Sequence, residues 1–294
     1  MSSVDLASTP VVSRPASPAR PRYRGAFGRL YRGEMRLVLG RRRNGALLAV
    51  LAIVPIFIGV AVKISAPGNG EGPQFIGQVS SNGLFLVFTA LTVALPFFLP
   101  LVIGVVAGDS IAGETGSGTL RYLLTVPVTR GRLLAVKALG VATFTAIAVL
   151  VVTIVGLVTG AVLFGLHPVV LLSGDTVPLA SGLWRTAAIA GYVSVALFAL
   201  AAGGVFVSTL TENAIAAMAT TIGIAVFSAL LDAVPQLSAV HKFLLTDHWL
   251  GFGELLRTSI SSGDLLRWSG LHVAYAAIFL SLAWARFTTK DVTS

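Results

Sequence analysis

The sequence predicts an all-α integral membrane protein with six transmembrane helices, and two observations lead to that class. Of the 294 residues, 55% are apolar and only 11% are charged, with a mean hydropathy of +0.87, whereas about 25% of the residues of a soluble domain are charged. The apolar residues form long unbroken runs rather than the short alternating segments of a membrane β-barrel. Cysteine is absent, which excludes disulfide frameworks, thiolate metal sites and thiol catalysis.

The N-terminal segment is strongly basic and divides into two parts. The first 43 residues hold ten of the 21 basic residues, opposed only by Asp5 and Glu34. Residues 1–23 contain four prolines, which disfavour a helix, so we expect a disordered basic cytoplasmic tail. Over residues 24–42 the pattern is typical of an amphipathic helix in the membrane interface; a solvated basic leader is the alternative. The apolar positions of that helix are Phe27, Leu30, Tyr31, Met35 and Val38.

Six apolar runs approach or exceed the ~20 residues that a helix needs to cross a bilayer. With the amphipathic helix they form one domain over residues 24–290. Three prolines, Pro55, Pro96 and Pro100, fall inside these runs, where membrane helices tolerate them. The six expected spans are 46–62, 84–107, 138–166, 186–207, 214–231 and 268–285.

The distribution of positive charge orients these spans in a cell membrane, plasma or inner. With the N-terminus in the cytoplasm, the cytoplasmic segments hold sixteen basic residues and the outer loops hold five, as the positive-inside rule requires. Both termini are therefore expected in the cytoplasm, with loops 63–83, 167–185 and 232–267 outside. The same asymmetry assigns the net charge of +9 to membrane lipids rather than to nucleic acid. The semi-apolar stretch 235–266 is expected to cap the bundle from outside as an interfacial helix.

The segment 108–137 between the second and third spans contains an incomplete phosphate-binding pattern. Gly113 and Gly118 have the separation found in G-x-x-x-x-G-K-[ST], but Thr119 and Leu120 follow instead of lysine and a hydroxyl residue. Without the lysine that reaches the phosphates there is no Walker A motif. We therefore expect this chain to bind no nucleotide.

The same segment is expected to bend after the second span and then to form a short amphipathic helix. A capping serine and a helix-stopping proline bracket three leucines at helical spacing. Such a helix, held between two spans at the cytoplasmic face, suits the transmission of force; a membrane-hugging loop is the equal alternative on spacing alone. The residues are Gly113, Gly116 and Gly118 for the bend, Ser117 and Pro127 for the helix ends, Leu120, Leu123 and Leu124 for its apolar face, and Thr129 as the cap of the third span.

A family resemblance favours the first alternative. The run Ala112-Gly113-Glu114, Gly118-Thr119-Leu120, Leu123-Leu124, Pro127, Thr129-Arg130 and Lys137 resembles the cytoplasmic loop of type-2 ABC exporter permeases, which include NosY-like and antibiotic-exporter permeases. The sequence departs from the pattern once: Val128 follows the proline, so Thr129 alone supplies the usual hydroxyl. Six spans and the polar turn 208–213 are consistent with the family.

The resemblance implies the permease subunit of an ABC exporter, paired with a second copy or a paralogue. Separate ATPase subunits would bind ATP and Mg and dock on the coupling helix in loop 108–137, so this chain would be no enzyme and would hold no cofactor. An ATP-independent secondary transporter or a membrane scaffold is the alternative; internal repeats and mid-membrane ionisable groups, typical of the former, are not found. The implied ATPase-coupling residues are Asp109, Glu114, Gly118, Thr119, Leu120, Arg121, Leu123, Leu124, Pro127, Thr129 and Arg130.

Two ionisable residues near the outer ends of spans form a second candidate site. Asp232 closes the fifth span and His272 lies one turn into the sixth, and ionisable groups at membrane depth are functional candidates. They either pair, line an exit, or simply face water and headgroups. The histidines at 241, 248 and 272 lack compact metal-ligand spacing, so no metal site is expected.

Overall fold

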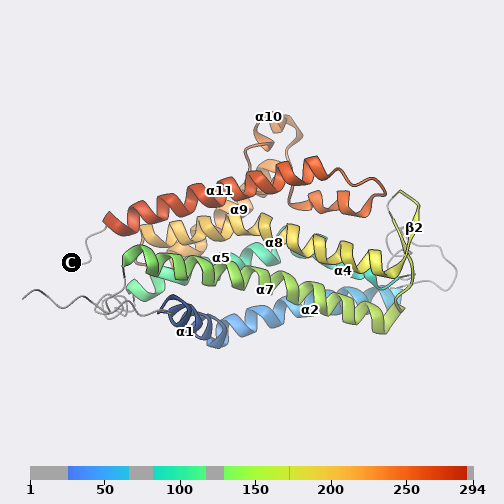
Figure 1. The fold of residues 1–294 in the computed structure, drawn as a ribbon, viewed down its shortest axis with the longest axis horizontal. Coiled ribbons are helices and arrows are strands. Elements are labelled where there is room, and N and C mark those ends of the chain that lie inside the picture. Colours follow the sequence, from blue (N-terminus) through green and yellow to red (C-terminus); the bar gives the residue numbers. More distant parts are fainter. Residues whose placement is uncertain (1–25, 66–81, 117–128, 172, 290–294) are drawn as a thin grey trace, which may run out of the picture.

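Long helices run side by side along one axis of the molecule (Figure 1). The computed structural model describes residues 26–65, 82–116, 129–171 and 173–289. Within them, six helices are long and apolar enough to cross a membrane, which confirms the predicted all-α class. These are α2 (Arg42–Ser65), α5 (Phe98–Gly116), α7 (Arg130–Phe164), α8 (Leu179–Leu210), α9 (Ala214–Asp232) and α11 (Ser262–Thr289).

Helix α1 marks one end of this bundle, and a short β-hairpin marks the opposite end. At the α1 end, α1 (Ala26–Gly40) lies near the end of α5 and the start of α7; at the hairpin end, β1 (Val169–Val170) and β2 (Thr176–Val177) form a short antiparallel hairpin (Figure 1). The hairpin, with Val169 opposite Val177, was not predicted. The expected tail 1–23 lies outside the described residues.

The second predicted span is broken, contrary to the single run expected over 84–107. A shorter helix, α4 (Leu84–Ala94), ends before Pro96, and α5 begins at Phe98. Proline lacks an N–H and restricts the residue before it, which explains the interruption. The two helices also pack differently: α4 lies mainly against α7, whereas α5 lies mainly against α9 and α8.

The predicted bend does not begin at Gly113, because α5 continues as a helix to Gly116; Gly118, the third glycine of that prediction, lies outside the described residues. Glycine weakens a helix by only about 1 kcal/mol, and packing outweighs that cost here. The helix passes so close to α9 that a Cβ on Gly108 would lie 2.6 Å from the backbone nitrogen of Met218. Small residues that allow such close approach are typical of membrane helix pairs.

The third span begins at Arg130, eight residues before the expected start at 138. Thr129 occupies the N-cap position, as predicted, but its side chain makes no capping hydrogen bond. Similarly, α2, α8 and α11 extend beyond the predicted spans 46–62, 186–207 and 268–285. Hydropathy marks only the part of a helix that suits lipid, whereas packing against neighbouring helices extends its polar ends.

The amphipathic N-terminal helix is present as α1 and packs on α7. Val38 is buried and Met35 is partly buried on its inner face, while the Tyr31 hydroxyl lies 2.7 Å from that of Thr143 on α7. Phe27 does not belong to this inner face, because its side chain is 37% exposed. The guanidinium of Arg132 on α7 lies over its ring. Position in the membrane interface stays a prediction.

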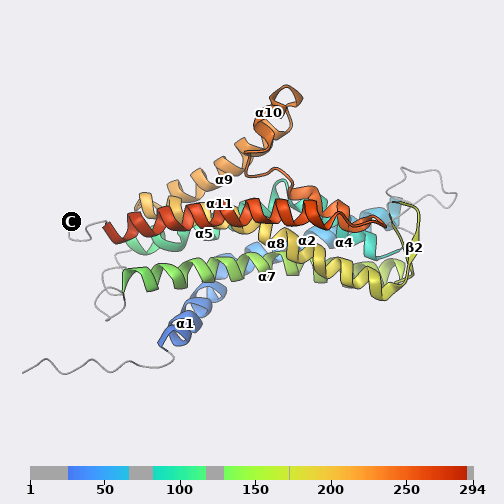
Figure 2. The same cartoon turned by 45° about the horizontal axis from the view of Figure 1, so that its top comes forward.

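The stretch 235–266 does not form the single capping helix that was expected. A 3₁₀ turn, η1 (Pro235–Leu237), and a short helix, α10 (Ser238–His241), project away from the bundle in both views (Figure 1, Figure 2). The chain then returns, and the 3₁₀ helix η2 (Trp249–Leu256) packs on α8 and α11. Its buried side chains, Trp249, Phe252, Leu255 and Leu256, explain the semi-apolar composition.

Candidate functional site

Charged side chains from α1, α2, α5 and α7 meet inside the α1 end of the bundle. Lys137 of α7 is only 2% exposed. Its ammonium lies 3.1 Å from both carboxylate oxygens of Glu34 on α1 and 2.5 Å from Oε1 of Glu114 on α5. One buried cation therefore connects three helices.

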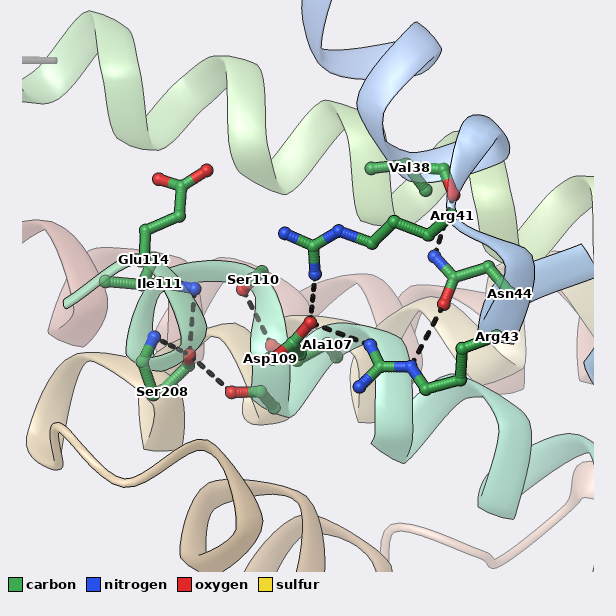
Figure 3. Close-up of polar contacts among 12 residues, drawn as sticks. Val38, Arg41, Arg43, Asn44, Ala107, Asp109, Ser110, Ile111, Glu114 and Ser208 are labelled. Carbon is green, nitrogen blue, oxygen red and sulfur yellow. Dashed lines mark hydrogen bonds and ion pairs between the residues drawn. The ribbon is translucent and has the colours of Figure 1, made fainter. Parts of the chain in front are cut away.

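A second group of charges lies next to the first, at the junction of α1 and α2. Figure 3 shows Arg41 and Arg43 reaching from this junction to the carboxylate of Asp109 on α5; the contact from Arg43 is 2.7 Å. Asn44, also buried, donates a hydrogen bond of 2.8 Å to the carbonyl of Val38 and so satisfies one of the carbonyls that a helix end leaves free.

These six ionisable side chains form a set that we call the α1 network. It consists of three cations (Arg41, Arg43, Lys137) and three carboxylates (Glu34, Asp109, Glu114). The two arginines are about two-fifths exposed, so solvent screens their pairs with Asp109. The Lys137 pairs are buried, and removal of one partner from a buried pair costs about 3 to 5 kcal/mol. A cavity of about 20 Å³ between these side chains has room for one water molecule.

A buried serine ties the same part of α5 to α8. The Ser208 hydroxyl donates to the carbonyl of Gly108 at 2.6 Å and accepts from the backbone N–H groups of Ile111 and Ala112 (Figure 3). All three bonding capacities of this hydroxyl are satisfied inside the protein. The last turns of α5 are thus held by α1, α7 and α8.

The predicted coupling residues fall into three structural groups. Asp109 and Glu114 lie on helix α5, not in a loop, and their carboxylates face other helices of the same chain. Thr129 and Arg130 stand at the start of α7, where Arg130 Nη1 lies 3.4 Å from the carbonyl of Thr288 on α11. The remaining seven, from Gly118 to Pro127, lie outside the described residues.

Sequence reasoning missed most partners of Asp109 and Glu114. Arg41, Arg43, Glu34 and Ser208 were not among the candidates, and Lys137 appeared only as part of a motif. One signal was available: between residues 24 and 43, Glu34 is the single acidic residue among seven arginines. An acidic residue in such a segment favours an internal partner over anionic lipid.

At the other candidate site, Asp232 and His272 do not pair. The Asp232 carboxylate lies 4.0 Å from His241 Nδ1. His272 is 1% exposed, with Nδ1 2.8 Å from the carbonyl of Trp268, so it does not face water. Within the described ranges, no group of three or more histidine, aspartate or glutamate residues is placed to hold a metal ion.

A comparison against known families covers most of the helices described above. A family model described as "ABC-2 family transporter protein" matches residues 38–292, from the end of α1 to beyond α11. The chain belongs to the ABC-2 transporter family. This confirms the resemblance that the sequence motif around Glu114 indicated.

Two curated relatives carry the description "Probable ABC transporter permease protein NosY". The protein of Pseudomonas aeruginosa is 36% identical over 110 residues, which cover 37% of this chain and 37% of that protein. The protein of Stutzerimonas stutzeri is 34% identical over 102 residues, which cover 35% and 36% respectively. The chain thus matches little more than a third of the length of these relatives.

Proposed function

We propose that this chain is the membrane permease subunit of an ABC exporter and that separate ATPase subunits drive it. Two findings support a permease role: the chain belongs to the ABC-2 family, and six of its described helices are long enough to span a membrane. The incomplete Walker A pattern at Gly113 and Gly118 lacks the phosphate-binding lysine, which supports ATP binding on a separate subunit. ATP and Mg would bind to the ATPase subunits, and this chain would carry out no chemistry.

The α1 network is the observation that carries the proposal. It joins α5 and α7, which flank residues 117–129, to each other and to α1 through buried ion pairs. A force applied to the intervening segment would therefore move the end of α5, the start of α7 and α1 together. Asp109 and Glu114 would act inside the chain by holding these helices in register, while Arg130 and the segment 118–127 would meet the ATPase.

The proposed assembly contains two permease chains, either identical or paralogous, and two ATPase subunits. It would lie in the plasma or inner membrane with the α1 end in the cytoplasm, where the basic residues of α1 would meet anionic headgroups. Arg29, Arg32 and Arg36 are exposed on α1, as such contact requires.

The proposal is tested by reconstituting the chain with its cognate ATPase and measuring transport and ATP hydrolysis together. The isolated chain should not hydrolyse ATP, and Leu123→Asp should weaken ATPase association because it places a carboxylate in the apolar contact. Thr289→Asp, an exposed position at the same end of the bundle, adds the same charge elsewhere and serves as the control. Stoichiometric nucleotide binding by the pure chain, or wild-type association in Leu123→Asp, would overturn the proposal.

A further inference from the structure

A cavity of about 390 Å³ lies where α9 ends, away from the α1 network. Three parts of the chain form its wall: Leu95 and Pro96 from the break between α4 and α5, Ala229, Asp232 and Ala233 at the end of α9, and residues 246–251. The cavity exists because the break in the second span and the returning stretch before η2 meet at this point.

The charged groups that line the cavity are acidic. Asp232 and Asp247 contribute two carboxylates, and the C-terminal end of α9 adds the negative end of a helix dipole. The described lining residues include no lysine or arginine. A histidine stands beside each carboxylate: His248 Nδ1 lies 2.6 Å from Asp247, and His241 Nδ1 lies 4.0 Å from Asp232.

The remaining wall is apolar and aromatic, and it is held in place by neighbouring helices. Trp249 is 4% exposed and lines the cavity, and its indole Nε1 has no hydrogen-bond partner among the residues that the structure describes. The backbone of His248 is left-handed, with φ of 60°. Its carbonyl accepts a hydrogen bond of 2.6 Å from the Tyr192 hydroxyl on α8, and its ring lies 4.5 Å from that of Trp268 on α11.

We propose that this cavity binds a small organic cation, a quaternary or protonated amine that carries an apolar body. The ammonium would lie by Asp232 and Asp247, and the apolar body would pack on Leu95 and Pro96. A pre-formed apolar cavity with a few polar groups is the usual form of a small-molecule site, and a tryptophan face attracts cations. A metal ion is not favoured, because the described residues place no third ligand there.

Binding is a property of this chain alone, so it can be tested without the ATPase. Choline is the probe, and its uncharged carbon isostere, dimethylbutanol, has the same shape without the charge. Calorimetric titration of the purified chain in maltoside detergent should show saturable choline binding, with the isostere about tenfold weaker or worse. Asp232→Asn and Asp247→Asn should each weaken choline binding by about tenfold, whereas Asp264→Asn, which lies outside the cavity lining, should not change it.

Two sources can supply this chemistry, a free cation or the choline headgroup of a lipid. A choline affinity that falls in phosphatidylcholine nanodiscs relative to detergent identifies the headgroup as the occupant, and an unchanged affinity identifies the free cation. Either result supports the site. Equal affinity for choline and the isostere, no saturable binding by protein that is folded by circular dichroism, or unchanged binding in both asparagine variants would overturn it.

Discussion

The ammonium of Lys137 lies 2.5 Å from Glu114 and 3.1 Å from both oxygens of Glu34, so three helices share one buried positive charge. Neither carboxylate has bulk water as a substitute partner, because their side chains are only 10% and 12% exposed. The register of α1, α5 and α7 therefore depends on this lysine more than on any of the exposed arginines of α1.

Removal of the shared charge should destabilise the fold. Lys137→Met leaves two buried carboxylates facing each other and should lower the free energy of unfolding by about 3 to 5 kcal/mol. Part of this loss should return in the double variant Lys137→Met with Glu114→Gln, because uncharged partners need no cation. Lys63→Met removes an exposed lysine at the other end of the bundle, which donates to the carbonyl of Leu163 and lies over the ring of Phe164, and should cost little. Thermal unfolding in detergent compares the three; a wild-type Tm for Lys137→Met would contradict the interpretation.

Coupling should depend on Glu114 and Arg130 in different ways. Glu114→Ala should loosen α5 from α7 and uncouple ATP hydrolysis from transport, and Arg130→Ala should weaken ATPase association, because loss of one partner of a desolvated pair can cost a few kcal/mol. Glu254→Ala removes a carboxylate paired with Arg257 in η2 and is the control.

Both rates are measured on the same reconstituted complex. A loop that is only a membrane tether predicts that Arg130→Lys is silent and that Glu114→Ala matters little. Normal coupling in Glu114→Ala and Arg130→Ala would leave the tether as the explanation.

Close approach of α5 and α9 should make Gly108 intolerant of a side chain. A Cβ there would lie 2.6 Å from the backbone of Met218, whereas a Cβ on Gly191 of α8 meets nothing within 4 Å. Gly108→Ala should therefore lower the Tm, and Gly191→Ala should raise it slightly, since alanine is favoured over glycine in a helix by about 0.5 to 1 kcal/mol. Equal effects of the two substitutions on thermal unfolding would argue against helix contact at Gly108.

Topology follows from charge and can be mapped with single cysteines, because the natural chain has none. Ser117→Cys should stay unlabelled when intact cells are treated with an impermeant thiol reagent, whereas Ser173→Cys in the exposed hairpin should react. Permeabilised cells provide the control that Ser117→Cys is reactive. Labelling of Ser117→Cys from outside would reverse the proposed orientation.

Choline binding should weaken on acidification. Burial raises the pKa of the Asp247 carboxyl, with His248 opposing that rise and Asp232 adding to it; Tyr192 and His272 face the same carboxyl from α8 and α11. A raised pKa means that Asp247 gains its proton at a higher pH than an ordinary aspartate, and the protonated form no longer attracts a cation. Calorimetric titrations at decreasing pH check this, and Asp247→Asn should flatten the dependence. An affinity that rises on acidification would contradict it.

Hydropathy alone predicts the six spans, because burial in lipid selects apolar runs whatever the helices pack against. It does not predict that α5 continues past Gly113 to Gly116, where local preference indicates a bend and contact with α8 and α9 decides otherwise. The α1 network could not be predicted from the sequence for a related reason. Lys137 and Glu34 are separated by 103 positions, and only the packing of α1 on α7 brings them together.

The interruption at Pro96 divides the second span between two neighbours. The half before it, α4, packs mainly on α7, and the half after it, α5, packs mainly on α9 and α8. The three residues between them therefore form a joint at which the two helices can change their relative angle. Leu95 and Pro96, which form this joint, are also part of the cavity wall beside Asp232. A tilt of α5 that starts at the α1 network would therefore change the shape of the proposed cation site.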